Sequence, residues 1–242
     1  MKRLPEYSQV FLQSPRLVAE LIGHSNIRKN DLVLDIGAGT GVITSVLAGR
    51  CKTVFAIEPE PRAAEKLRQN TMHFQNVKIA QADILRYPLP PGPYKVFANI
   101  PFHLSSPIVQ HLAFAPNPPQ SVYLIVQKQF ANKLLANNRH FTSQLGAQLA
   151  PWWTVRIRRP LKKTDFYPYP AVDTVLLEIK HRTETLLPPE RAVAYREFIK
   201  KAFETPAFYH TLPLAKTGIN PEHTPSQLTG EQWAQLYARA TE

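Results

Sequence analysis

The sequence contains a single cysteine, Cys51, among its 242 residues. One cysteine excludes an internal disulfide and any Cys-x-x-Cys metal or redox pair, so we expect a buried, inert thiol. The eight histidines show no HExxH or other ligand spacing, so we expect no metal. The sequence shows no signal peptide and no apolar run long enough to span a bilayer. We therefore expect a cytoplasmic protein that does not enter a membrane.

Acidic residues are missing from one long segment. Between Asp83 and Asp165 the chain has no Asp or Glu but ten Lys or Arg. The net charge of +11 is also uneven, because residues 183–242 hold six basic and seven acidic side chains whereas residues 1–182 hold 23 and 11. A carboxylate on a surface that faces a polyanion would repel phosphate. The local absence of acids therefore favours a nucleic-acid-binding surface over general solubility.

Short apolar runs alternate with amphipathic helical segments, which predicts a mostly parallel sheet with helices around it. We expect strands at residues 31–36, 53–57, 77–80, 94–98, 121–126, 152–157 and 172–179, the last two alternating as antiparallel strands do. Ser14-Pro15 predicts the start of a helix that runs across Leu17–Ile22. Further helices are expected after the first strand and at residues 130–136, 191–203 and 231–240.

A glycine-rich loop, Gly37-Ala38-Gly39-Thr40-Gly41, follows the first predicted strand. Glycines there let the backbone turn sharply and approach a ligand closely. The loop fits GxGxG but not GxGxxG, because Val42 occupies the last glycine position of the dinucleotide fingerprint. This disfavours NAD or FAD and suits a ligand with an amino-acid tail and a nucleoside but no phosphates. GxGxG by itself has low specificity.

Two acidic residues follow the next two strands. Glu58 ends the second strand, about twenty residues after the glycine loop, where a carboxylate can bind two ribose hydroxyls. Asp83 follows the third strand and could accept a hydrogen bond from an adenine amine. Each acid alone would suit a solvated strand end. Because ligands gather at the carboxyl ends of parallel strands, the two acids and the glycine loop together predict a nucleoside site.

The fourth strand delivers Asn99-Ile100-Pro101-Phe102 to the same edge. The Asn99 side chain can accept hydrogen bonds from an exocyclic amine. Pro101 stiffens the turn and favours an extended Ile100, and Phe102 can stack on a ring taken out of its helix. An ordinary strand end with a proline turn could have the same four residues.

Basic residues and aromatic residues occur together in the second half of the chain, which suits contacts to RNA backbone and bases. An exposed loop with packed aromatics is the alternative. The candidate RNA-binding residues are Lys128, Lys133, Arg156, Arg158, Arg159, Lys162, Lys163, Phe166 and Tyr167.

The order of these motifs closely resembles the ribosomal RNA adenine N6-dimethyltransferases. The motifs are Gln9-x-Phe-Leu12, Asp35-x-Gly-x-Gly-x-Gly41, Glu58, Ala82-Asp83, Asn99–Phe102, Val126-Gln127-Lys128 and Tyr167-Pro-x-Pro-x-Val-Asp-Thr174. The resemblance implies an α/β, Rossmann-like methyltransferase fold with a mostly parallel seven-stranded sheet, plus a small C-terminal all-α domain. We expect the domains at residues 1–182 and 183–242.

The resemblance also implies S-adenosylmethionine as methyl donor and assigns roles to residues. Its binding set would be Gln9, Leu12, Gly37, Gly39, Gly41, Glu58, Asp83 and Asn99. The catalytic set would be Asn99, Ile100, Pro101 and Phe102, which hold the N6 amine and stack on the flipped adenine. One departure stands out, since the family's Gln-Asn-Phe-Leu appears here as Gln9-Val10-Phe11-Leu12. The family's Asn helps to bind the methionine end, so position 10 can offer only its backbone.

Two branches of the family fit. Asn-Ile-Pro-Phe and the short helical tail resemble the erythromycin-resistance type, which acts on 23S rRNA. The housekeeping type, which dimethylates two adjacent adenines of small-subunit rRNA, usually has Asn-Leu-Pro-Tyr and a longer tail. The favoured partner is therefore 23S rRNA with a single-stranded or flipped adenine, and we expect a monomer. A non-catalytic RNA-binding or transcription-associated protein and a DNA adenine methyltransferase are further alternatives.

Overall fold

The computed structural model describes residues 11–12, 14–137 and 141–241. Its strands are β1 (Phe11–Leu12), β2 (Leu32–Ile36), β3 (Thr53–Ile57), β4 (Val77–Ala80), β5 (Lys95–Asn99), β6 (Ser121–Gln127), β7 (Trp153–Leu161), β8 (Phe166–Tyr167) and β9 (Thr174–His181). Its α-helices are α1 (Pro15–Gly23), α2 (Val42–Ala48), α3 (Pro61–Thr71), α4 (Ser105–Ala113), α5 (Lys128–Leu134), α6 (Gln144–Leu149), α7 (Ala192–Glu204), α8 (Pro206–Thr211) and α9 (Gly230–Ala240).

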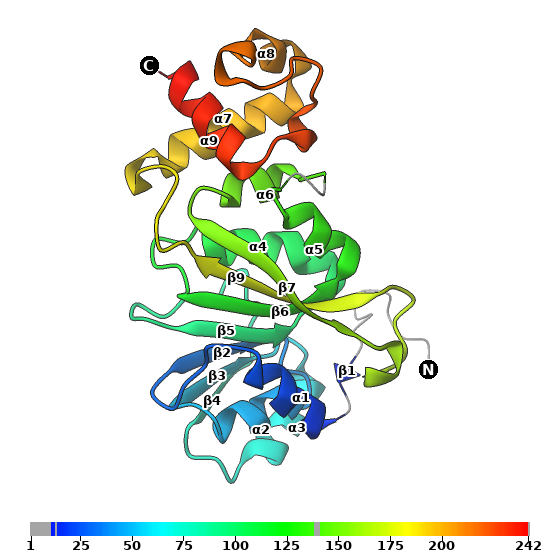
Figure 1. Ribbon diagram of the computed structural model, residues 1–242. Helices are drawn as coiled ribbons and strands as arrows, with labels where there is room; N and C mark the ends of the chain where they lie inside the picture. Colours follow the sequence, from blue (N-terminus) through cyan, green and yellow to red (C-terminus); the bar gives the residue numbers. More distant parts are fainter. Residues whose placement is uncertain (1–10, 13, 138–140, 242) are drawn as a thin grey trace. The chain divides into compact units, whose positions relative to one another are not determined.

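The main sheet has seven strands in the order β4-β3-β2-β5-β6-β9-β7 (Figure 1). The pairs β3–β4, β2–β3, β2–β5 and β5–β6 are all parallel. The carboxyl ends of β2, β3, β4 and β5 therefore lie at one edge. Because the chain continues from β4 to β5 on the other side of β2, this edge contains the switch point where α/β sheets bind ligands. The predicted mostly parallel, seven-stranded α/β sheet is confirmed.

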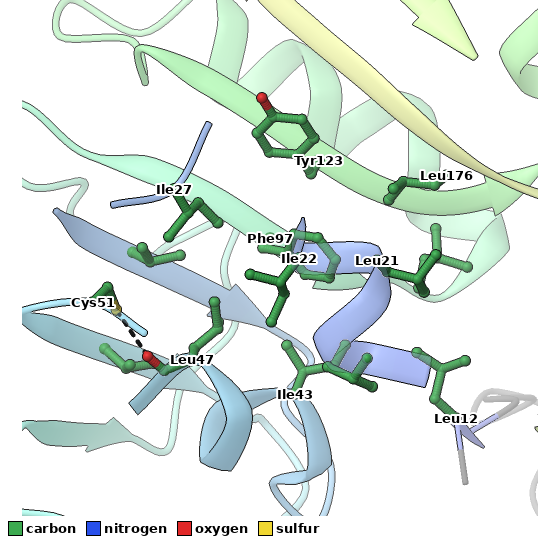
Figure 2. Close-up of a cluster of buried hydrophobic side chains, with 14 of the residues drawn as sticks. Leu12, Leu21, Ile22, Ile27, Ile43, Leu47, Cys51, Phe97, Tyr123 and Leu176 are labelled. Carbon is green, nitrogen blue, oxygen red and sulfur yellow. Dashed lines mark hydrogen bonds between the residues drawn. The ribbon is translucent and has the colours of Figure 1, made fainter. Parts of the chain in front are cut away.

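Helix α1 forms where the local sequence predicts it and is anchored by its buried face. The Ser14 side chain accepts a hydrogen bond from the Leu17 N–H (3.3 Å), and Pro15 occupies the first helical position, as the sequence predicts. The helix buries Val18, Leu21 and Ile22. Figure 2 shows Leu21 and Ile22 among core side chains from α2 and the sheet. The Cys51 thiol is buried in the same cluster and donates to the Leu47 carbonyl.

Strand β7 differs from the prediction because it continues to Leu161, beyond the expected end at residue 157. Arg158 and Arg159 thus lie on the strand, as Arg156 does, and not in the loop that an end at residue 157 implied. The exposed residues alternate as Arg156, Arg158 and Pro160, since successive side chains of a strand point to opposite faces. Two of the three arginines are therefore on the exposed face.

The chain divides into two compact units, residues 1–128 with 157–178 and residues 129–156 with 179–242. In the second unit, Gln148 of α6 donates to the Arg196 carbonyl of α7 (3.0 Å), and the Tyr195 hydroxyl donates to the Ala147 carbonyl (3.1 Å). Trp233 of α9 is fully buried in this unit's aromatic core. The predicted C-terminal helices are present, although α6, from before residue 182, packs with them. The predicted domains at 1–182 and 183–242 stay a prediction.

Two features are absent from the residues that the structure describes. Over residues 11–12, 14–137 and 141–241, no helix is long and apolar enough to cross a membrane. The same part of the chain contains no group of three or more His, Cys, Asp or Glu side chains arranged to hold a metal ion.

Candidate active site

The glycine loop after β2 has an unusual backbone. Gly37, Gly39 and Gly41 have φ angles of 67°, 57° and 95°, a region that residues with a Cβ rarely adopt. The Gly37 N–H donates to the Ile57 carbonyl (2.8 Å), which ties the loop to the end of β3. The loop is therefore a backbone cradle, fixed between two strand ends, where a ligand can approach the main chain.

Glu58, directly after β3, also holds this loop. Its carboxylate is buried, and Oε2 accepts the Gly39 N–H (2.7 Å) while Oε1 accepts the Glu60 N–H (3.0 Å). Burial raises the pKa of Glu58, and the two backbone donors oppose that shift. Each carboxylate oxygen keeps a further acceptor position beside the backbone donor that it binds.

Asp83 and the Asn99–Phe102 turn complete the edge. Asp83 is exposed, and its Oδ1 accepts the Leu85 N–H (3.0 Å), which fixes the carboxylate after β4. Asn99 is the last residue of β5 and is half-buried. Ile100 is buried, and Pro101 leads into a short 3₁₀ helix, η2 (Phe102–Leu104), which leaves Phe102 partly exposed. The predicted amide, stiff turn and aromatic ring thus follow one another at the end of β5.

Asp35 is a second buried acid at this edge, which the sequence reasoning passed over as a site residue. It lies on β2, is fully buried, and its Oδ2 accepts the Thr44 hydroxyl (2.6 Å). Its Oδ1 has no hydrogen-bond partner among the described residues. Burial raises the pKa of Asp35 to about 7, and the charge of Glu58 adds to the rise. Its place in the Asp-x-Gly-x-Gly-x-Gly motif was the available signal.

This raised pKa predicts a pH-dependent stability. A carboxyl group whose folded pKa lies above its ordinary value of 3.8 contributes stability below pH 3.8, and the contribution is lost as the pH rises through about 7. We therefore expect the free energy of unfolding to decrease by a few kcal/mol over this interval. Asp35→Asn should make the free energy of unfolding, measured in urea at several pH values, depend less on pH. The smaller pH dependence that remains is due to Glu58. The exposed Asp173→Asn is the control, and an unchanged slope in Asp35→Asn would contradict the assignment.

The N-terminal motif is partly outside the described residues, because Gln9 and Val10 are not described. Leu12 is described, and its side chain is 4% exposed within the hydrophobic core. The expected ligand contact of Leu12 is thus limited to its backbone. The sequence reasoning did not anticipate Phe11, whose ring lies against the glycine loop: a Cβ on Gly39 would be 3.1 Å from Phe11 Cε1.

The candidate RNA-binding residues have unequal exposure. Exposed side chains belong to Lys128, Lys133, Arg156, Arg158, Lys162, Lys163 and Tyr167. Two of the arginines have acidic partners, since Arg158 forms an ion pair with Glu178 (3.7 Å) and Arg159, partly buried, pairs with Glu20. The expected RNA contact does not hold for Phe166, which is 0% exposed and packs in the core. A ring enclosed on both faces offers no surface to a base.

Comparisons with known proteins agree with this geometry. A family model described as ribosomal RNA adenine dimethylase matches residues 2–207. The rRNA adenine N-6-methyltransferase of Bacillus licheniformis is 27% identical over 259 residues, which cover 98% of this chain and 88% of the relative. The ribosomal RNA small subunit methyltransferase A of Streptococcus equi subsp. zooepidemicus is 29% identical over 191 residues, 75% of this chain and 66% of the relative.

A solved structure supports the fold. The 23S rRNA methyltransferase ErmE has a TM-score of 0.82 at 24% identity and covers 96% of this chain and 100% of its own. The fold likeness and the family match agree with the motifs at the sheet edge. This chain is therefore an rRNA adenine methyltransferase that belongs to the ribosomal RNA adenine dimethylase family.

Proposed function

We propose that this protein transfers one or two methyl groups from S-adenosylmethionine to N6 of a specific adenine in 23S rRNA, which would confer macrolide-lincosamide-streptogramin resistance. The observation that carries the proposal is that the glycine loop, Glu58, Asp83 and Asn99 lie at the carboxyl ends of four strands that are adjacent and parallel in the sheet. An rRNA substrate also fits a cytoplasmic protein.

The residues at the edge fit this donor. The methionine end would lie against Gly37, Gly39 and Gly41, where a Cβ at the last two positions would meet Phe11 or Leu67 side-chain atoms within 3.1 Å. Glu58 would accept the ribose hydroxyls and Asp83 the adenine amine. S-adenosylmethionine, when bound, supplies a methyl group on a sulfonium leaving group, so the protein needs no nucleophile of its own.

The remaining task for the protein is to orient the acceptor. The adenine N6 lone pair is delocalised into the ring, so this amine is a poor nucleophile. The Asn99 side-chain oxygen and the Ile100 carbonyl would accept the two N6 hydrogens and favour a pyramidal nitrogen, while Phe102 stacks on the base. Positioned acceptors of this kind can contribute several kcal/mol to transition-state stabilisation. After one transfer N6 keeps a hydrogen, so a second transfer needs no new chemistry.

One feature of this chain favours 23S rRNA over 16S rRNA. Asn99-Ile100-Pro101-Phe102 has the form expected of the resistance branch. Methylation of 16S rRNA in ribosome assembly is the second candidate.

The decisive experiment supplies labelled S-adenosylmethionine with protein-free 23S or 16S rRNA and maps the label by reverse-transcription stops. Label at one adenine of 23S rRNA would support the proposal, whereas label only near the 3′ end of 16S rRNA would overturn it in favour of the housekeeping reaction. No label in either RNA would also overturn it as stated. Calorimetry would then separate a particle-dependent enzyme, which binds the donor, from a non-catalytic RNA-binding protein, which does not.

A further inference from the structure

Helix α3 lies against the glycine loop, although it follows the next strand of the chain. It packs beside α2, the helix that begins at the end of the loop (Figure 1). A Cβ on Gly41 would lie 2.7 Å from Leu67 Cδ1 and 3.3 Å from Thr71 Cγ2, and both of these side chains are buried. Leu67 and Thr71 are four positions apart, so they lie on one face of α3. The loop therefore rests against this face.

Asn70 connects α3 to the loop by a hydrogen bond. Its side-chain Nδ2 donates to the Thr40 carbonyl (2.8 Å), across 30 positions of the chain. Asn70 comes three positions after Leu67, so it borders the buried face of α3, although it is itself exposed. Thr40 stands between Gly39 and Gly41, whose φ angles are 57° and 95°. The hydrogen bond therefore fixes a peptide group in the part of the loop where the backbone turns.

The start of α3 is connected to the same loop through Glu58. Glu58 Oε2 accepts the Gly39 N–H (2.7 Å), and its Oε1 accepts the Glu60 N–H (3.0 Å). Glu60 in turn caps α3, because its side chain accepts the Arg62 N–H (3.1 Å) and the Ala63 N–H (2.6 Å). Both ends of α3 are thus linked to the glycine loop, the first through two carboxylates and the second through the amide of Asn70.

We propose that Asn70 is a positioning residue for the methyl donor, because it holds the glycine loop in its binding conformation from α3. The proposal rests on the proposed function, since it takes S-adenosylmethionine as the ligand of this loop. A loop that is already held in shape loses less conformational freedom when a ligand binds, which increases affinity. Glu58 holds an N–H of the loop and Asn70 holds a carbonyl. Asn70 acts through Thr40 and does not need to touch the donor.

The test is calorimetric binding of S-adenosylmethionine to Asn70→Ala, with Gln69→Ala as the matched control. Gln69 is the exposed neighbour on α3, and its amide donates to Glu65 of the same helix (3.2 Å). Loss of one hydrogen bond from a side chain to the backbone predicts a Kd about three- to tenfold higher in Asn70→Ala. Asn70→Asp has the same shape but no N–H to donate, so it should weaken binding at least as much. Asn70→Gln keeps the amide and should recover part of the affinity.

Methylation kinetics separate positioning of the donor from a general loss of structure. Asn70→Ala should raise the KM for S-adenosylmethionine by the same factor as the Kd. The kcat and the KM for rRNA should stay near wild type, because the turn that begins at Asn99 is proposed to orient the acceptor. Equal Kd values in Asn70→Ala and Gln69→Ala would overturn the proposal. A decrease of kcat without a change of Kd would also overturn it.

Amide hydrogen exchange, measured by NMR without the donor, tests whether Asn70 holds the loop. The Gly39 N–H donates to Glu58 and the Gly41 N–H donates to the Ala38 carbonyl (2.9 Å). Both amides should exchange faster in Asn70→Ala than in the wild type, and Gln69→Ala should leave them unchanged. If the wild type binds no S-adenosylmethionine, the proposed function fails, and the exchange rates still decide whether Asn70 holds the loop. Unchanged exchange in Asn70→Ala would overturn the role of Asn70 even in a protein that binds the donor.

Discussion

Asn99→Ala is expected to lower the turnover number for methyl transfer by about 10²–10³-fold, the effect typical of removing one preorganised polar contact at a reacting centre. Asn99 ends β5 and is followed by a buried Ile100 and a stiff proline turn, so its position is fixed by the sheet. In the proposed mechanism, the acceptor it offers to N6 matters most when the nitrogen becomes pyramidal. Binding of the donor would depend mainly on the glycine loop, Glu58 and Asp83.

The measurement is single-turnover methylation together with calorimetric binding of S-adenosylmethionine. Asn99→Asp keeps an acceptor oxygen and should retain more turnover than Asn99→Ala. Asn30→Ala is the matched control, because Asn30 is exposed just before the start of β2 and so lies at the opposite edge of the sheet. Equal losses of turnover and of donor binding in Asn99→Ala would show that Asn99 mainly shapes the donor pocket.

Gly41→Ala is expected to reduce the free energy of unfolding by about 2–5 kcal/mol, from backbone strain of about 1–2 kcal/mol and overpacking of about 1–3 kcal/mol. Gly41 has a φ of 95°, and its Cβ would lie 2.7 Å from Leu67 Cδ1 and 3.3 Å from Thr71 Cγ2. The buried Leu67 side chain would have to move within the core, or the loop would have to open away from α3. Opening of the loop would displace the glycine cradle, so donor affinity should fall as well.

Gly49→Ala provides the control from the other end of the same helix. Gly41 caps the start of α2 and Gly49 caps its end, but Gly49 has a φ of −78° and its Cβ would meet nothing closer than 3.7 Å. The free energies of unfolding of Gly41→Ala and Gly49→Ala, measured in urea, should therefore differ by most of the decrease that is predicted for Gly41→Ala. Similar stabilities would show that the loop accommodates a Cβ at position 41 by relaxation.

Much of the site could be predicted from the sequence, because the chemistry lies at strand ends. Apolar runs mark the parallel strands, and the residue after each run must lie at the carboxyl edge of the sheet. This places the glycine loop, Glu58, Asp83 and Asn99 together before any coordinates are known. The helix that begins at Ser14-Pro15 was equally predictable, since its cap and its apolar spacing are local in the sequence.

Only the tertiary structure decided which side chains are exposed and how they are charged. The sequence could not distinguish Phe166 from Tyr167, and pairing with β1 buries the first and exposes the second. Likewise, the sequence does not distinguish Asp35 from other acidic residues at strand ends. Only in the folded structure does burial raise the pKa of Asp35 to about 7. The residues at strand ends were determined by the sequence because that placement depends on local pattern. Burial and pairing depend on contacts between residues far apart in the chain, and those exist only in the folded protein.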